Sequence, residues 1–211
     1  MTLEVEAGIL EEMIYNVLLW TPGKGDAKKV LSEGLVEVQF DEDDISFMST
    51  DGYVSVRTAT TDKAIRRERV FVQGWELKAA GAEVGKLEAS SKSEIKLEVD
   101  AQGNRLWIGP GFVEIHTPKT DIGFWNYMSN IMRGSIEVAQ SGPFAIDPRR
   151  LTKFSLLAPR ETYPVDFIHR EVGGGHPVIF WKHGPRTRGM VSPLSRQTLS
   201  EAFAEEKEVL W

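Results

Sequence analysis

The sequence predicts an α+β fold built from tandem units, each with a strand, a helix and a meander of antiparallel strands. Short runs in which apolar and polar residues alternate, separated by turn-forming pairs such as Asp51-Gly52, indicate the strands. Longer segments whose apolar residues recur every three or four positions indicate the helices. The order strand, helix, strands recurs three times, at about 1–60, 68–117 and 136–194.

The first unit begins with the alternating residues 2–6, a predicted strand, and continues with a predicted helix over 8–20. This helix carries an apolar stripe made of Ile9, Leu10, Met13, Ile14, Val17 and Leu18. Glu11, Glu12 and Asn16 fall mostly off the stripe, on the polar side of the helix. Three alternating runs then predict strands at 35–40, 45–49 and 53–58.

The second unit is predicted to start with a strand at 70–72 and to continue with a helix over 75–87. Three glycines count against this helix because glycine has a low helix propensity: Gly74, Gly81 and Gly85. Strands are expected at 95–99, 106–108 and 112–115. The following segment, 117–142, is interpreted as an aromatic-rich connection that ends in a strand at 135–140.

The third unit opens with a predicted strand at 144–146, after which Asp147 is expected to cap a helix that begins at Pro148. Leu151, Phe154 and Leu157 recur at helical spacing and Pro159 is expected to end the helix. Apolar runs predict strands at 165–168, 178–181 and 189–194. Residues 195–211 form a charged tail whose apolar positions could make a short amphipathic helix.

The composition is that of an ordinary globular protein, with 41% hydrophobic and 27% charged residues in 211. The absence of cysteine excludes disulfides, thiolate zinc sites and cysteine nucleophiles, and it fits a reducing compartment. Neither a signal peptide nor a membrane-spanning run is evident in the sequence. A net charge of −6 argues against a surface that is basic throughout, but it permits one basic face.

Five segments, in this order, resemble the bacterial-type DNA sliding clamps, the beta subunits of DNA polymerase III. The opening MTLEVEAGILEEMI resembles the first strand and helix of the clamps, and ISFMSTDGYVSV resembles a clamp strand pair around its turn. GFWNYMSNIM resembles the clamp connection FPDYRRLIP, with Trp125 and Met132 in place of its prolines. FAIDPRRLTKF resembles the helix start FNPxYLxxF, and RGMVSPL the terminal strand LMPMR, although its second methionine is lacking.

The resemblance implies a sliding-clamp fold whose helices lie on one face of antiparallel sheets, in the shortened form of bacteriophage clamps. It implies one clamp-like domain of two half-units at 1–121, a second and shortened domain at 122–195, and a C-terminal tail at 196–211. Clamp rings close with twelve half-units, so three half-units per chain would make a ring of four chains. A dimer or a trimer remains an alternative.

The same resemblance implies a protein that encircles duplex DNA without reading its sequence and makes a polymerase processive, and that is not an enzyme. The expected partners are double-stranded DNA, peptides of the DNA polymerase and clamp loader, and further copies of the chain. No cofactor, no metal and no membrane is expected, and the location would be the cytoplasm, that of a bacterial host for a phage protein.

Two sets of site residues follow from the resemblance. Basic residues on the second and third helices are expected to meet DNA phosphates: Lys78, Lys86, Arg149, Arg150 and Lys153. The first helix contributes only acidic side chains, so loop cations at Lys28, Lys29, Arg66, Arg67 and Arg69 could compensate. The terminal strand is expected to supply part of an apolar peptide cleft: Met190, Val191, Pro193 and Leu194.

Catalytic and metal motifs are weak in this chain. His169, His176 and His183 recur every seven residues, but no carboxylate partner accompanies them, so a zinc site is not favoured. Gly173-Gly174-Gly175 lacks the lysine and helix of a phosphate loop. Two alternatives to a ring stay open: a clamp-like adaptor or decoy that binds replication proteins without encircling DNA, and an enzyme on an unrelated α+β fold.

Overall fold

The computed structural model describes residues 1–25, 32–61, 68–101, 103–119, 122–132, 139–140, 146, 148–157, 163–172 and 176–193. The first unit consists of β1 (Thr2–Glu6), α1 (Ala7–Leu18), β2 (Leu35–Phe40), β3 (Ile45–Thr50) and β4 (Val54–Ala59). The second consists of β5 (Glu68–Gln73), α2 (Gly74–Val84), β6 (Lys92–Asp100), β7 (Gly103–Ile108) and β8 (Gly111–His116). After α3 (Ile122–Met132), the third consists of β9 (Ala139–Gln140), α4 (Pro148–Phe154), β10 (Val165–Val172), β11 (His176–His183) and β12 (Thr187–Val191).

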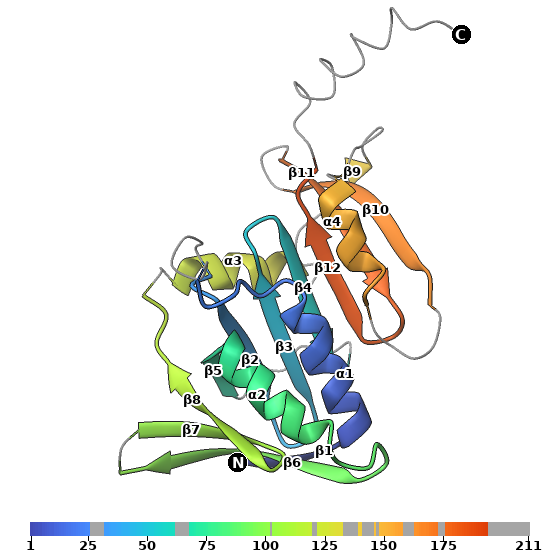
Figure 1. Ribbon diagram of the computed structural model, residues 1–211. Helices are drawn as coiled ribbons and strands as arrows, with labels where there is room; N and C mark the ends of the chain where they lie inside the picture. Colours follow the sequence, from blue (N-terminus) through green and yellow to red (C-terminus); the bar gives the residue numbers. More distant parts are fainter. Residues whose placement is uncertain are drawn as a thin grey trace, which may run out of the picture.

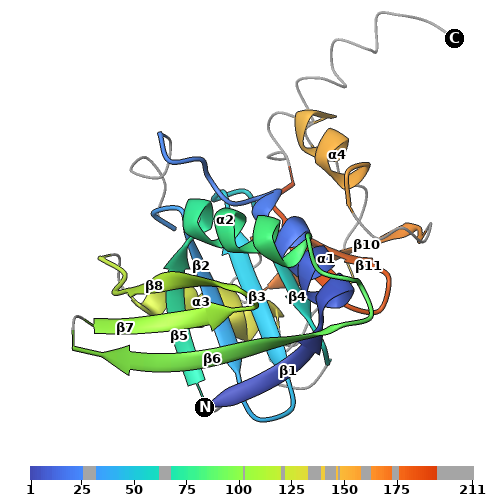
Figure 2. The same cartoon turned by 60° about the horizontal axis from the view of Figure 1, so that its bottom comes forward.

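The predicted order of strand, helix and three strands is confirmed in the first two units, and the helix and the three strands after it are confirmed in the third. Within the described residues the strands join into one twisted sheet in the order β1-β6-β7-β8-β5-β2-β3-β4-β12-β11-β10-β9, with antiparallel neighbours throughout (Figures 1 and 2). The first and third units are joined through β4 and β12, where Val56 pairs with Gly189. The first and second are joined through β2 and β5, where Val36 pairs with Val72.

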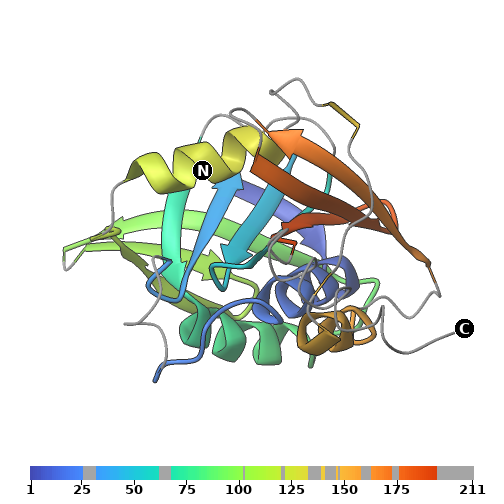
Figure 3. The same ribbon diagram turned by 90° about the horizontal axis from the view of Figure 1, so that it is seen from above.

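Helices cover both faces of this sheet, but unequally. Figure 3 shows α1, α2 and α4 on one face and α3 alone on the opposite face. Strand β2 explains how both faces are filled, because its side chains alternate between them. Val36, Val38 and Phe40 belong to the core beneath α1 and α2, whereas Leu35 packs in the smaller core beneath α3. All six residues of β2 are buried as a result.

The helix α3 corrects the interpretation of 117–142 as a connection. Trp125 of α3 is fully buried and packs against Phe71 of β5, with ring centroids 5.3 Å apart. A polar pair lies under the same helix: Arg69 donates to the buried Glu37 at 3.0 Å and to Asn126 of α3 at 2.6 Å. The helix is therefore attached to the sheet through both an aromatic contact and an ion pair.

The third unit is attached to the first by aromatic packing as well as by strand pairing. Trp20, which follows α1, lies 5.4 Å from Phe154 of α4 and 5.2 Å from Trp181 of β11, measured between ring centroids. Phe154 and Trp181 are themselves in edge contact at 4.9 Å. All three side chains are buried, so this cluster belongs to the core beneath α1, α2 and α4. The side of the sheet that carries these three helices is called the helix-bearing face below.

Two expectations about individual residues were wrong. Asn16, assigned to the polar side of the first helix, is fully buried and donates a hydrogen bond to the Thr187 hydroxyl at 3.1 Å. Leu151, assigned to the apolar stripe of the third helix, is 41% exposed; the helix ends at Phe154, and Phe154 is the residue that it buries. Pro148 does begin its helix, as predicted.

Several predicted features lie outside the described residues: the cap at Asp147, the stop at Pro159, the turn at 173–175, most of the strands expected at 135–140 and 144–146, and the tail from 196. Among the helices that the structure describes, none has the length and apolar character needed to cross a membrane.

Candidate functional site

The helix-bearing face carries the five basic residues expected to meet DNA. Lys78 and Lys86 lie on or just after α2 and are exposed, and Lys86 pairs with Glu83 at 2.5 Å. Arg149 is exposed at the start of α4. Because α1 contributes Glu11 and Glu12 to the same face, the cations are not spread evenly over the three helices.

The other two basic residues of α4 are engaged within the chain. Arg150 donates a hydrogen bond to the Ser192 carbonyl at 3.0 Å, and its guanidinium lies 4.2 Å from the ring centroid of Tyr53. Lys153 pairs with Asp51 at 3.5 Å. These contacts fasten α4 to the β3–β4 hairpin and to the residue after β12.

The turn of the hairpin that contacts α4 is held by side-chain hydrogen bonds. Asp51 Oδ1 accepts hydrogen bonds from the backbone N–H groups of Tyr53 and Val54 at 3.0 and 2.9 Å. Gly52 has φ +94°, a conformation that glycine adopts without strain. The predicted Asp-Gly turn is thus confirmed, and it has a second use as the docking point of α4.

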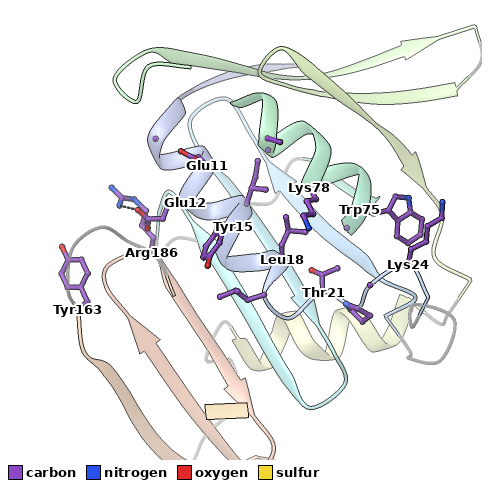
Figure 4. A pocket seen from close by; sticks show the side chains of 18 of the residues that line it. Glu11, Glu12, Tyr15, Leu18, Thr21, Lys24, Trp75, Lys78, Tyr163 and Arg186 are labelled. Atoms are coloured by element: carbon purple, nitrogen blue, oxygen red, sulfur yellow. Dashed lines mark ion pairs between the residues drawn. The ribbon is translucent and has the colours of Figure 1, made fainter. Parts of the chain in front are cut away.

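A groove of about 1050 Å³ runs over the same face between α1 and α2 (Figure 4). Its walls are two stripes at helical spacing, with Glu11, Tyr15 and Leu18 on α1 facing Trp75 and Lys78 on α2. Helical spacing of three and four residues places such side chains on one side of a helix. The outer surface of the helix pair is therefore hollowed rather than convex.

The two ends of this groove differ in their charged side chains. Glu11 and Glu12 lie toward one end, where Glu12 pairs with Arg186 at 3.9 Å (Figure 4). Toward the other end, Lys24 Nζ lies 5.6 Å from the ring centroid of Trp75. Sequence reasoning missed the groove. Its signal was the presence of aromatic residues, Tyr15 and Trp75, on helix sides that do not face the core.

The residues expected in the peptide cleft lie at the end of β12. Met190 is 6% exposed and packs in the core beneath α3, while Val191 is fully buried in the core on the opposite face of the sheet. Alternation along a strand accounts for this division. Pro193 is half-buried, and Leu194 lies outside the described residues. The four residues therefore do not form a single open surface in the part of the chain that is described.

The loop cations considered as compensation are placed only in part. Lys28, Lys29, Arg66 and Arg67 lie outside the described residues. Arg69 lies in β5 and is bound to Glu37 and Asn126 on the face of α3, opposite to α1 and α2. Its assignment as a compensating cation for the helix-bearing face was therefore wrong.

Histidines provide one cluster of potential metal ligands, but not the one that spacing suggested. Along the β10–β11 pair, His169 is paired with Ile179, His176 with Val172 and His183 with Val165, so the three residues are spread along the hairpin. The fourth histidine, His116, instead lies beside Glu76 and Glu114. No spacing rule indicates this group, because its members come from α2 and β8 and meet only through the fold.

Comparisons with known structures identify the fold. The chain is similar to the DNA polymerase III beta subunit of Thermotoga maritima, with a TM-score of 0.60 and 13% identity over 92% of this chain and 65% of that one. It is also similar to the DNA polymerase sliding clamp of Bacillus subtilis, with a TM-score of 0.54 and 13% identity over 91% of this chain and 64% of that one. A third similar structure is the Helicobacter pylori beta clamp bound to a DNA ligase peptide, with a TM-score of 0.54 and 11% identity over 92% of this chain and 66% of that one.

The likeness concerns the fold and not the sequence. No protein-family model and no curated protein matches the chain. The chain spans less than two thirds of the length of each of these three clamps. The alternative of an unrelated α+β fold is excluded, because the matched structures cover more than nine tenths of the chain. The chain has the fold of the bacterial DNA polymerase III beta sliding clamps, in a shorter form.

Proposed function

We propose that this protein is a DNA sliding clamp that encircles duplex DNA without sequence specificity and acts as a processivity factor for a polymerase. It would tether replication proteins through a peptide-binding cleft and work in the cytoplasm of a bacterium or of a phage-infected bacterial host. The observation that carries the proposal is the placement of α1, α2 and α4 on one face of a continuous sheet (Figure 3). In a closed ring this face would line the hole.

The charges on that face support contact with phosphates at selected points. Lys78, Lys86 and Arg149 are exposed there, and exposed Lys and Arg bind the DNA backbone through long-range, sequence-independent attraction. Arg150 and Lys153 are held in contacts to the β3–β4 hairpin, so their contribution to DNA binding would be weaker. The carboxylates of α1 oppose binding along one part of the face.

Ring closure would use the two ends of the sheet. Within the described residues β1 is paired on one side only, with β6, and β9 on one side only, with β10. Unpaired strand edges invite pairing with another chain. Three half-units per chain, grouped as domains 1–121 and 122–195, would complete a ring of twelve as a tetramer. A dimer or a trimer would need a different half-unit count.

The proposed peptide cleft would lie at the end of β12, around Pro193; Leu194, the fourth residue expected in it, lies outside the described residues. Met190 and Val191 would support it from beneath, because both are buried in the flanking cores. Polymerase and clamp-loader peptides would be its ligands. Among the matched structures, the Helicobacter pylori clamp is bound to a DNA ligase peptide.

A second candidate function is favoured by the acidic α1. A clamp-like adaptor or decoy would bind replication proteins without enclosing DNA, and it would need no basic bore. Glu11 and Glu12 on the helix-bearing face, together with the engaged Arg150 and Lys153, fit this function better than they fit a ring.

Retention on circular DNA distinguishes the two functions. The protein is incubated at high concentration with closed circular DNA, so that rings which open spontaneously can enclose it, and free protein is then removed at elevated salt. A ring stays on the circle and leaves when the DNA is cut once. An adaptor is lost from both forms of DNA while it still binds replication proteins.

A matched pair of variants tests the face that meets the DNA. The double substitution Lys78→Ala and Lys86→Ala removes two exposed cations from the helix-bearing face. Lys182→Ala removes one exposed cation from the opposite face, because Trp181 and Ile179 of the same strand point toward the helices. The ring predicts that the double variant shortens retention and that Lys182→Ala does not. Equal effects of both would contradict the proposed orientation.

A further inference from the structure

Three potential metal ligands converge where the second unit joins its helix to its last strand. One ligand atom from each of Glu76, Glu114 and His116 lies within 4.8 Å of the other two. His116 Nε2 and Glu76 Oε2 are already 3.2 Å apart. The side chains of His116 and Glu76 are 32% and 28% exposed, and Glu114 is exposed, so an ion from solvent could reach the group.

The backbone brings these residues together. Glu114 and His116 are two positions apart on β8, which places both side chains on one side of the strand. β5 leads directly into α2 at Gly74, and β5 pairs with β8 at Phe71 and His116. The first turn of α2, which contains Glu76, therefore emerges beside the end of β8.

The donor set suits a zinc ion. One imidazole nitrogen and two carboxylate oxygens are ligand types that Zn²⁺ binds at about 2.0–2.2 Å, with a water in the fourth position of a tetrahedron. Bonds of that length separate neighbouring ligand atoms by about 3.3 Å. The 3.2 Å between His116 Nε2 and Glu76 Oε2 matches this separation. Glu114 is exposed, so a side-chain rotation can bring its carboxylate nearer.

We propose that Glu76, Glu114 and His116 form a Zn²⁺ site that fastens α2 to β8. The described β5–β8 junction consists of two paired positions, Phe71 with His116 and Val72 with Ile115, so an ion across it would stabilise the second unit. A cationic side chain lies close to this group. Arg105 of β7 is opposite Glu114 of β8 in the strand register, and its guanidinium lies 4.8 Å from the ring centroid of Phe112.

The competing explanation is a metal-free ion pair between His116 and Glu76. Glu114→Gln separates the two explanations, since it removes one proposed ligand and leaves that ion pair intact. His116→Gln removes both the ligand and the pair. Glu83→Gln is the matched control, because Glu83 is an exposed glutamate of the same helix and belongs to a pair with Lys86.

The experiment is equilibrium dialysis of the full-length chain against Zn²⁺ followed by elemental analysis, with Mg²⁺ in parallel and a thermal melt of each sample. The site predicts one equivalent of Zn²⁺, no comparable uptake of Mg²⁺, and a melting temperature that rises with Zn²⁺. Affinity should fall at least tenfold in Glu114→Gln and His116→Gln and remain unchanged in Glu83→Gln.

Two results would overturn the site. One is the absence of stoichiometric Zn²⁺ uptake by the wild-type chain. The other is equal uptake by the wild type, Glu114→Gln and His116→Gln, which would place any bound ion elsewhere. Because Glu114 is exposed, its variant is expected to fold, and circular dichroism of the metal-free samples verifies this before affinities are compared.

Discussion

Gly81 of α2 lies directly against Ile14 of α1: a Cβ added to Gly81 would be 2.7 Å from Ile14 Cγ2. These two helices approach closely because α2 has no side chain at this point. Gly74 makes a similar contact with the Thr21 side chain. The glycines that lower the helix propensity of α2 are thus part of its contact with α1 and with Thr21, which follows α1, and they allow the two walls of the groove to lie close together.

The first prediction concerns this helix contact. Gly81→Ala should destabilise the protein by about 1–2 kcal/mol, because overpacking of about 1–3 kcal/mol exceeds the gain of up to about 1 kcal/mol in helix propensity. Urea unfolding measures the change. Gly85→Ala is the control. Its Cβ would meet the flexible Glu11 carboxylate, which can rotate away, so the free energy of unfolding should remain unchanged. A stabilised Gly81→Ala would show that the helices are not in this contact.

The second prediction concerns the attachment of the third unit. A Cβ on Gly189 would overlap both the Ser55 carbonyl and the indole of Trp181, so Gly189→Ala should cost roughly 3 kcal/mol or more. Gly23→Ala, where a Cβ meets nothing within 4 Å, should cost far less. Urea unfolding followed by tryptophan fluorescence compares the two. Equal stabilities would mean that β12 does not pair with β4 as described.

The sequence predicted the secondary structure of the described units well, because alternation and helical spacing are local signals. β2 was placed at its observed bounds, and the helix starts near Ala7 and at Pro148 were recognised within a residue or two. The α2 prediction extended to 87 although the helix ends at Val84, since Leu87 continues the apolar spacing beyond the last helical residue.

Features that depend on which elements meet were not accessible from local patterns. The role of α3 was missed because Trp125 could only be identified as a core residue once Phe71 was known to lie beneath it. Asn16 was misassigned because its partner, Thr187, is 171 residues away. The cluster around His116 likewise joins a helix and a strand forty residues apart, so no spacing rule could reveal it.

The third prediction concerns the ion pair under α3. Glu37 is 1% exposed and Arg69 27% exposed, so Glu37→Ala should cost about 2–3 kcal/mol, somewhat less than a fully buried pair. Hydrogen exchange should also increase in α3, because Arg69 links Glu37 to Asn126. The control Glu98→Ala breaks a surface pair with Lys96 and should change stability by less than about 1 kcal/mol. Unchanged exchange in α3 would contradict the link.

The fourth prediction concerns the contact between α4 and the hairpin. Arg150→Ala and Tyr53→Ala should each destabilise the protein by about 0.5–1 kcal/mol, because the contact is partly exposed. The double variant should lose less than the sum, with a coupling energy of about 0.5 kcal/mol. Urea unfolding of the wild type, the two single variants and the double variant gives this double-mutant cycle. Additive losses would show that the two side chains do not interact in solution.

Assembly of these chains into a ring is best tested by their mass in solution. Sedimentation across a concentration series from nanomolar to high micromolar measures it without any DNA or partner protein. We expect one closed oligomer whose mass is constant over a wide concentration range, with four chains if twelve half-units complete the ring. A strict monomer at high micromolar concentration would contradict the ring and favour the adaptor.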